Sequence, residues 1–309
     1  MPVVIGIDEA GYGPQLGPLV ISSAAFQLPA DPMNTDLWTL LDGAVCRSRR
    51  GANGRLLVAD SKQVYGRGRG LDDLERAVLG FLAPNAADPP HSLAALMATL
   101  DQDADQLSTT AWWTDLPLPA ATAPQDIRTA AARLEAPDVQ CLGLATRVVP
   151  APAFNRLTRR HGNKSVLLFQ KNMELVSGSL ARHPGDLTFL IDKHGGRHYY
   201  TELLANNFFG RQVLARSESP RQSVYEIALP DRTLTFAFIE KADHHHLPVA
   251  LASMTSKYIR ELCMQCFNAY WCGRVEGLEP TAGYAADSRR FIAAIRPLIN
   301  DDDDVIRNC

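Results

Sequence analysis

The sequence lacks long apolar runs, a strong charge of either sign and a basic N-terminal leader. No apolar run in its 309 residues reaches the roughly 18 residues that a membrane-spanning helix needs, so we expect no membrane partner. The net charge of −3 does not indicate a polyanion partner, although a basic patch can lie on an acidic protein. Because no basic segment followed by an apolar one opens the chain, we expect no signal peptide and a cytoplasmic location.

The cysteines and histidines are not arranged as a disulfide framework or a zinc site requires. Six cysteines do not make such a framework in a chain of this length. Cys263 and Cys266 form a C-x-x-C within a helical pattern, and without a second pair buried thiols are favoured over a metal site. His244 to His246 are consecutive and cannot all face one ion. We interpret them as a polar loop at the edge of a site; the alternative is that one of them modulates a metal or a phosphate.

The pattern of apolar residues predicts an α/β fold. With 46% hydrophobic and 21% charged residues, the composition is that of an ordinary globular protein. Strands are predicted at 3–7, 18–26, Cys141 to Val149, Leu187 to Ile191, 223–229 and 233–240. Helices are predicted at 36–46, 71–83, Asn163 to Leu180, Tyr199 to Phe209, Leu247 to Trp271 and Ser288 to Leu298. This order favours a mixed sheet with helices on its faces.

Two stretches fit this pattern less well. The segment at about 84–135 is rich in Ala, Pro and Asp, and we interpret it as a partly helical insertion whose role the sequence leaves open. The tail NDDDDVIRNC is acidic, and we expect it to be solvated.

Three apolar segments end in acidic residues, next to residues that loosen the backbone. They are VVIGIDEAG with Asp8 and Glu9, LTFLIDKHGG with Asp192, and FAFIEKADHHH with Asp243 shortly after Glu240. Acids are costly in a core unless they are paired or bind a metal. Each acid alone could be a helix cap or half of a surface ion pair, and the repeated position at strand ends is what suggests a shared site.

If these carboxylates converge at the rim of the sheet, a cation must offset their repulsion. Oxygen ligands suit Mg²⁺ or Mn²⁺, and two such ions can activate a water and stabilise a leaving oxygen in phosphoryl transfer. Neighbouring strand side chains point to opposite faces. Asp8 and Glu9 therefore share a site only if the strand ends, twists or bulges near Glu9, and Gly11 and Gly13 provide that freedom.

The glycine-rich run DEAGYGPQLGPLV, residues 8–20, does not fit a dinucleotide-binding fingerprint. Its GYGPQLG is one residue too long for G-x-G-x-x-G, and Pro14 and Pro18 would break the helix that should follow. The basic stretches RSRRGANGR and GRGRG, together with Arg159 and Arg160, are either phosphate contacts or solvated loops.

Five motifs, taken in order along the chain, resemble the type 2 ribonuclease H (ribonuclease HII) family. DEAGYGPQLGPLV resembles its N-terminal signature, Asp60-Ser61-Lys62 its DSK segment, and FLIDKHGG the strand that carries its third acid. KADHHHLPVALASMTSKYIRELCM, 241–264, resembles the segment with its last acid, and AGYAADSRR, 282–290, its C-terminal glycine-tyrosine segment. The segment at 84–135 has no counterpart in the family pattern.

The resemblance implies a single ribonuclease H-like domain over 1–309, with the insertion at about 84–135 and a C-terminal helical part at about 247–300. It implies a metal-dependent endonuclease that cuts RNA in RNA–DNA hybrids or at ribonucleotides embedded in duplex DNA, and we expect a monomer. The catalytic, metal-binding acids of the family match Asp8, Glu9, Asp192 and Asp243. Its substrate-binding positions match Gly11, Tyr12 and Gly13 in the glycine loop, Lys62 and Lys257 near the substrate backbone, and Tyr284 against a sugar.

The chain also departs from the family pattern. Tyr12 stands where the family usually has arginine, Ala286 and Arg289 replace a threonine and a histidine, and His244 to His246 replace small residues. These changes leave the four acids intact but leave the preferred substrate open. The alternative function is a catalytically altered nucleic-acid-binding relative with the same fold, in which the changed loop no longer places a ribonucleotide.

Overall fold

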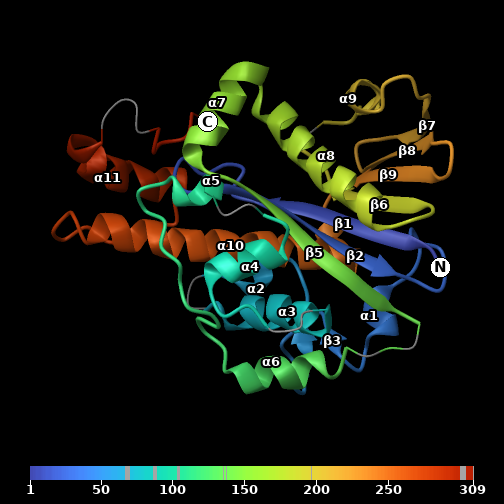
Figure 1. The fold of residues 1–309 in the computed structure, drawn as a ribbon, viewed down its shortest axis with the longest axis horizontal. Coiled ribbons are helices and arrows are strands. Elements are labelled where there is room, and N and C mark those ends of the chain that lie inside the picture. The colour runs from blue at the N-terminus through green and yellow to red at the C-terminus, as the bar shows by residue number, and fades with distance from the viewer. Residues whose placement is uncertain are drawn as a thin grey trace.

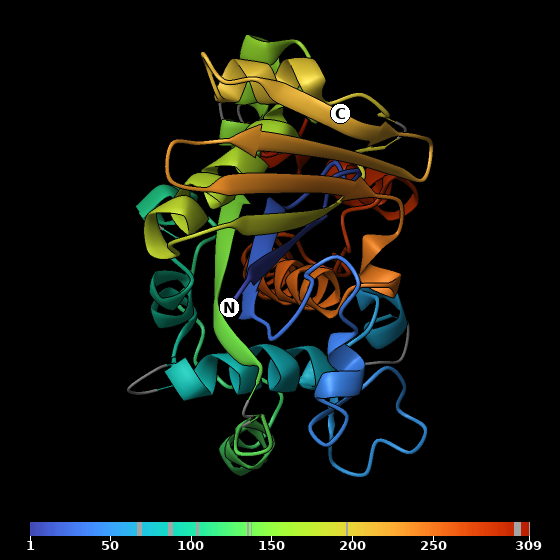
Figure 2. The same cartoon turned by 90° about the vertical axis from the view of Figure 1, so that its right-hand side faces the viewer.

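The computed structural model describes residues 1–309 apart from 67–69, 86–88, 103–104, 135, 137, 196, 300–303 and 309. A seven-stranded sheet in the order β5-β2-β1-β6-β9-β8-β7 lies at its centre (Figure 1 and Figure 2). The strands are β1 (Val3–Ala10), β2 (Leu19–Gln27), β5 (Gln140–Val149), β6 (Leu187–Asp192), β7 (Val213–Glu218), β8 (Gln222–Ala228) and β9 (Thr233–Ile239). β1, β6 and β9 run parallel, and the other neighbours are antiparallel. The predicted mixed sheet flanked by helices is confirmed.

Helices cover both faces of the sheet, because the central strands bury side chains on both sides. Val4 packs into a core with α10, whereas Val3, Ile5 and Ile7 pack into a second core with α8. Figure 1 shows α8 and α10 on opposite faces. The helices are α1 (Leu37–Leu40), α2 (Ser61–Val64), α3 (Asp72–Leu82), α4 (Leu93–Thr99), α5 (Asp105–Ser108), α6 (Pro124–Ala131), α7 (Ala151–His161), α8 (Lys164–Arg182), α9 (Thr201–Asn207), α10 (Leu247–Cys272) and α11 (Ala285–Ile295), with 3-10 turns η1 (Ala83–Asn85), η2 (Ala242–His244) and η3 (Arg296–Leu298).

The helix α10 lies directly against β1, and this contact sets the position of the acids. Pro248 occupies the first turn of α10, where a missing N–H costs nothing. At Gly6 a Cβ atom would lie 2.2 Å from the carbonyl carbon of Pro248, so only glycine allows the backbones to approach this closely. Asp8, two residues further along β1, therefore lies on the face that α10 covers.

Most predicted elements are confirmed to within a few residues, but one predicted helix is wrong and one strand was not predicted. The segment 36–46 is not one helix: α1 ends at Leu40, and Val45–Cys46 form β3, which pairs with β4 (Leu56–Leu57). Gly43, a poor helix former, lies between α1 and β3. The strand β7 was not predicted, because it is largely exposed and its VLARSE sequence lacks a buried alternating face.

The segment predicted as an insertion folds onto the core of the sheet. Leu93, Leu96 and Ile127 join the same apolar cluster as α10. A buried carboxylate ties this segment to α3, because Glu75 accepts hydrogen bonds from the backbone amides of residues 120–122 at 2.6–2.7 Å and from the Tyr258 hydroxyl at 2.7 Å. These four donors satisfy a side chain that would otherwise be costly to bury.

The fold bears on two features noted in the sequence, the lack of a membrane-spanning helix and the C-x-x-C cysteines. Among the described residues, none of the helices is both long and apolar enough to cross a bilayer. Cys263 and Cys266 are buried thiols on α10, as the helical pattern predicted, and the Cys266 thiol lies 3.3 Å from the carbonyl oxygen of Thr114.

Candidate metal centre

Asp8 and Glu9 lie inside β1, so the prediction that they follow the end of a strand is wrong. The strand continues because β2 pairs with it from Val3↔Gln27 as far as Ala10↔Val20. On its other side, the pairing of β1 with β6 stops at Ile7↔Ile191. Asp192, the last residue of β6, comes level with Asp8 in this register, so β1 runs past the end of its parallel neighbour from Glu9 onward, at the rim of the sheet.

Asp192 and Asp243 come to this rim from the two neighbouring parallel strands. Asp192 is the last residue of β6, and its Oδ1 accepts a hydrogen bond of 2.8 Å from the backbone amide of Ala242. Lys241, with a left-handed φ of 54°, turns the chain from β9 into η2, which carries Asp243. Parallel strands end at the same edge of a sheet, and side chains from such ends can converge on one site.

The four acids lie close enough to oppose one another's ionisation. Burial raises the pKa of Asp8 well above its ordinary value, and the charges of Glu9, Asp192 and Asp243 raise it further. Burial and then the charge of Asp192 raise the pKa of Glu9 to about 8. Burial also raises the pKa of Asp192 to about 6, and burial followed by the charge of Asp60 raises that of Asp243. The four acids predicted from the sequence, here called the four-acid cluster, are thus linked electrostatically, because charges within the cluster raise the pKa of Asp8, Glu9 and Asp192.

A hydrogen-bonded network supports the Asp8 backbone from the α10 side. The Ser256 hydroxyl donates to the carbonyl oxygen of Asp8 at 3.0 Å and lies 2.9 Å from the hydroxyl of Ser22 on β2. Ser22 in turn lies 3.0 Å from the Thr146 hydroxyl on β5. The network links three adjacent strands to α10, so it holds β1 in place just where the acids begin.

Asp60 and His244 extend the site beyond the four acids. The His244 Nε2 atom lies 3.4 Å from Asp60 Oδ2 and 3.9 Å from Asp243 Oδ1. In the part of the chain that the structure describes, these three residues are the trio whose possible ligand atoms all lie within 4.8 Å of one another. Asp60 was not predicted as a site residue. The signal was present, because Asp60 also follows an apolar segment, LLVA, as the other acids do.

The basic and aromatic residues predicted to contact substrate have different surroundings. Lys62 is exposed, and its positive charge lowers the pKa of three acids of the cluster, so it faces the site. The Lys257 Nζ atom instead forms an ion pair with Glu261 Oε1 at 2.8 Å. The Tyr284 side chain is 49% exposed, and the Arg260 guanidinium carbon lies 5.5 Å from the centre of its ring. Of these three side chains, Lys62 is the one whose charge changes the pKa values of the acids.

The glycine loop has the backbone freedom that the sequence suggested. Gly11 has a left-handed φ of 87°, and a Cβ there would lie 2.6 Å from the carbonyl oxygen of Pro18. Gly13 is exposed, with open space around its Cα. The loop therefore turns sharply at Gly11 and presents backbone at Gly13.

The C-terminal segment is hydrogen-bonded to this loop, a contact that the sequence did not reveal. Arg307 is 1% exposed, donates to the carbonyl oxygens of Gly11 and Tyr12, and lies 3.8 Å over the Phe154 ring. Asn155 holds the same segment through the Ile306 carbonyl at 2.9 Å. The expectation of a solvated tail is wrong for this part, because Arg307 is buried and its guanidinium finds acceptors in the glycine loop. A buried charge is costly without such partners. Residues 300–303 and 309 of the tail lie outside the described residues.

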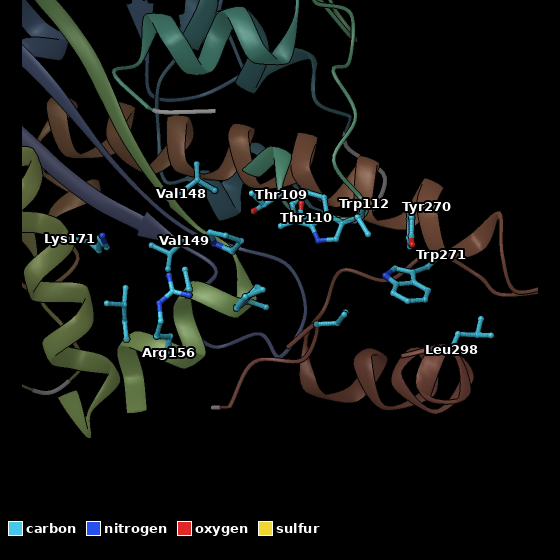
Figure 3. Close-up of a pocket in the computed structure, with 17 residues that line it drawn as sticks. Thr109, Thr110, Trp112, Val148, Val149, Arg156, Lys171, Tyr270, Trp271 and Leu298 are labelled. Carbon is cyan, nitrogen blue, oxygen red and sulfur yellow. The ribbon is translucent and has the colours of Figure 1, made fainter. Parts of the chain in front are cut away.

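A separate pocket of about 850 Å³ lies between the end of β5, α7 and the C-terminal end of α10. Figure 3 shows Arg156, Val149, Trp112 and Trp271 around it. Its described lining residues include none of the predicted site residues. This pocket is therefore distinct from the candidate metal centre.

No family model and no curated protein matches the sequence. The fold is similar to a solved structure described as the PCNA:RNase HII complex from Archaeoglobus fulgidus, with a TM-score of 0.48, 15% identity, and coverage of 99% of this chain and 94% of that chain. It is also similar to ribonuclease H2 from Pyrococcus horikoshii OT3, with a TM-score of 0.47, 15% identity, and coverage of 99% of this chain and 92% of that chain. A third similar structure is Bst-RNase HIII in complex with Mn²⁺, with a TM-score of 0.43, 14% identity, and coverage of 99% of this chain and 66% of that chain.

Proposed function

We propose that the protein is a divalent-metal-dependent endonuclease of the type 2 ribonuclease H kind. Its substrate would be RNA in RNA–DNA hybrids or ribonucleotides embedded in duplex DNA. One observation supports the proposal: the pKa values of Asp8, Glu9, Asp192 and Asp243 are all raised, and the charges of other acids in this set contribute to the rise for Asp8, Glu9 and Asp192. A cation placed among these groups would remove the repulsion that opposes their ionisation.

The donor set fits Mg²⁺ or Mn²⁺, because its ligands are carboxylate oxygens on three separate elements. When bound, such an ion supplies Lewis-acid stabilisation of a phosphodiester and a water of lowered pKa. The Asp60–Asp243–His244 trio lies beside these acids and offers further ligands for a cation.

The chain's own residues then have the task of placing the substrate. Lys62, exposed and close to the acids, can meet a phosphate oxygen of the scissile strand. The open backbone at Gly13 allows a 2′-hydroxyl to approach the loop amides, and this contact is what distinguishes RNA from DNA.

The test offers labelled RNA–DNA hybrid, duplex DNA with one embedded ribonucleotide, and plain duplex DNA, each with Mg²⁺, Mn²⁺ or EDTA. We expect cuts on the RNA-containing strand that leave a 3′-hydroxyl and a 5′-phosphate, and no cuts in EDTA or in plain DNA. If neither RNA-containing substrate is cut with either metal, the enzyme proposal fails. Binding without cutting would then favour the nucleic-acid-binding relative.

The variant Asp8→Asn tests the position of the site. It removes one charged ligand from the four-acid cluster, and we expect activity to fall by roughly 100-fold or more. Asp42→Asn is the matched control, because Asp42 is exposed and lies outside this cluster. Full activity in Asp8→Asn would place the active site elsewhere, even if the protein proves to be a nuclease.

A further inference from the structure

A second group of basic and aromatic residues lies beside the glycine loop, on the face of the sheet opposite α10. It surrounds an open pocket of about 500 Å³ formed by the loop itself, the start of α8 and the segment that follows β6. We call it the basic pocket; its lining includes Tyr12, Ser165, His194, Arg197, His198 and Tyr199. Tyr12 is the position at which the sequence departs from the arginine of the family pattern, so the surroundings of its side chain bear on the substrate.

Arg197 is held in place beside this pocket, and several polar atoms of its lining have no hydrogen-bond partner among the described residues. The Arg197 guanidinium donates to the Ser165 hydroxyl at 2.9 Å, which fixes the loop after β6 against α8. Among the described residues, Arg197 Nε and His198 Nδ1 are buried and have no hydrogen-bond partner. His194 is 2% exposed, and its Nδ1 also lacks a partner within the described part of the chain. Buried polar atoms without partners are rare, and a group of them around one pocket points to a ligand that would satisfy them.

Positive charge converges on the same pocket from α8. This helix has 19 residues and begins at Lys164 and Ser165, so the positive end of its dipole faces the pocket. The Lys164 Nζ atom lies 4.8 Å from the centre of the Tyr12 ring. A cation therefore stands next to position 12, although it comes from α8 and not from the glycine loop.

We propose that the basic pocket binds a backbone phosphate of the nucleic-acid substrate, next to the nucleic-acid strand that would be cut at the four-acid cluster. Arg197 and His198 donate to the phosphate oxygens, and Lys164 supplies the charge that Tyr12 does not carry. The rings of Tyr12 and of Tyr199, which is 69% exposed, flank the pocket and offer surfaces on which an adjacent base can stack. This inference rests on the proposed function for the identity of the substrate, but not for the existence of the subsite.

The test measures the affinity of the full chain for a fluorescent RNA–DNA hybrid in EDTA, where no cutting occurs, over a series of salt concentrations. We expect Arg197→Gln to weaken binding roughly tenfold. The slope of log affinity against log salt should become shallower by about 0.9, the value for one lost phosphate contact. Arg197→Lys should recover most of the slope, because it keeps the charge. Arg128→Gln on α6 is the matched control, since α6 and α8 lie on opposite sides of the molecule (Figure 1 and Figure 2). It should leave both quantities unchanged.

Equal affinity and equal slope in wild type and Arg197→Gln, with both melting at the same temperature, would overturn the subsite. If the wild-type protein does not bind the hybrid, the proposed function fails instead, and inorganic phosphate then serves as the probe. Phosphate should shift the imidazole NMR signals of His198 in the wild type and not in Arg197→Gln. No shift at millimolar phosphate would overturn the subsite in that case as well.

Discussion

Glu9 gives the sharpest test of the metal centre, because its ionisation should destabilise the protein when no cation is bound. Burial and the charge of Asp192 raise the pKa of Glu9 from 4.5 to about 8. A carboxyl group whose pKa is raised on folding stabilises the fold below its unfolded pKa, and this contribution is lost as the pH rises towards the folded pKa. Glu9→Gln keeps the shape of the uncharged acid and removes the titration.

The magnitude follows from the two pKa values. At about 1.4 kcal/mol for each pH unit between them, ionisation of Glu9 costs up to roughly 4 kcal/mol of unfolding free energy by about pH 8. A chain of this size gains roughly 2 °C in Tm for each kcal/mol. Since Glu9 is partly exposed and some repulsion is screened, we expect Glu9→Gln to melt roughly 4–8 °C above the wild type in EDTA at about pH 8. At about pH 5 the two should differ little.

Thermal unfolding followed by circular dichroism measures this difference, with Glu202→Gln as the control because Glu202 is exposed on α9. Millimolar MnCl₂ at about pH 8 should raise the Tm of the wild type and raise that of Glu9→Gln less, because a bound cation stabilises the folded state by mass action. If Glu9→Gln melts below the wild type at both pH values, or if Mn²⁺ stabilises both proteins equally, the four acids do not repel one another as described.

Three further substitutions test other parts of the structure. Tyr12→Arg should change hybrid cleavage less than about threefold, since α8 already supplies a cation there; a large gain on single embedded ribonucleotides would show that Tyr12 narrows the substrate range. Arg307→Met should lower the urea-unfolding free energy by about 3 kcal/mol, because the buried carbonyls of Gly11 and Tyr12 lose their donor; an unchanged midpoint would contradict this role. Gly6→Ala should cost about 3 kcal/mol or more in the same assay, because its Cβ meets the Pro248 backbone at 2.2 Å; wild-type stability would show that α10 can move away.

Periodicity located the elements that are buried on a regular face. The strand that ends at Asp192 and the long helix that ends at Cys272 were each predicted from their first residue to within one residue of their end. Such segments carry enough apolar residues at one spacing to determine both their type and their limits. The exposed strand β7 had no such signal, and its pairing with β8 decides its conformation.

The candidate site divides in the same way. The sequence by itself showed acids at the ends of apolar segments, where burial is costly, and the resemblance to a known family singled out Asp8, Glu9, Asp192 and Asp243 among them. Only the tertiary structure decided which other groups join them. Asp60 and His244 meet across segments far apart in the chain, and Arg307 reaches the glycine loop from the other terminus.

The tertiary structure also changed the meaning of Tyr12. From the sequence this residue is a lost cation; in the fold it lies beside Lys164 and lines a pocket with Arg197. Charge and hydrogen-bond partners act through space at distances of a few ångströms, whereas sequence patterns report only on residues that share one helix or strand. For this reason the sequence located the acids along the chain, and the packing of β1, β6 and α8 decided where they lie in space and what surrounds them.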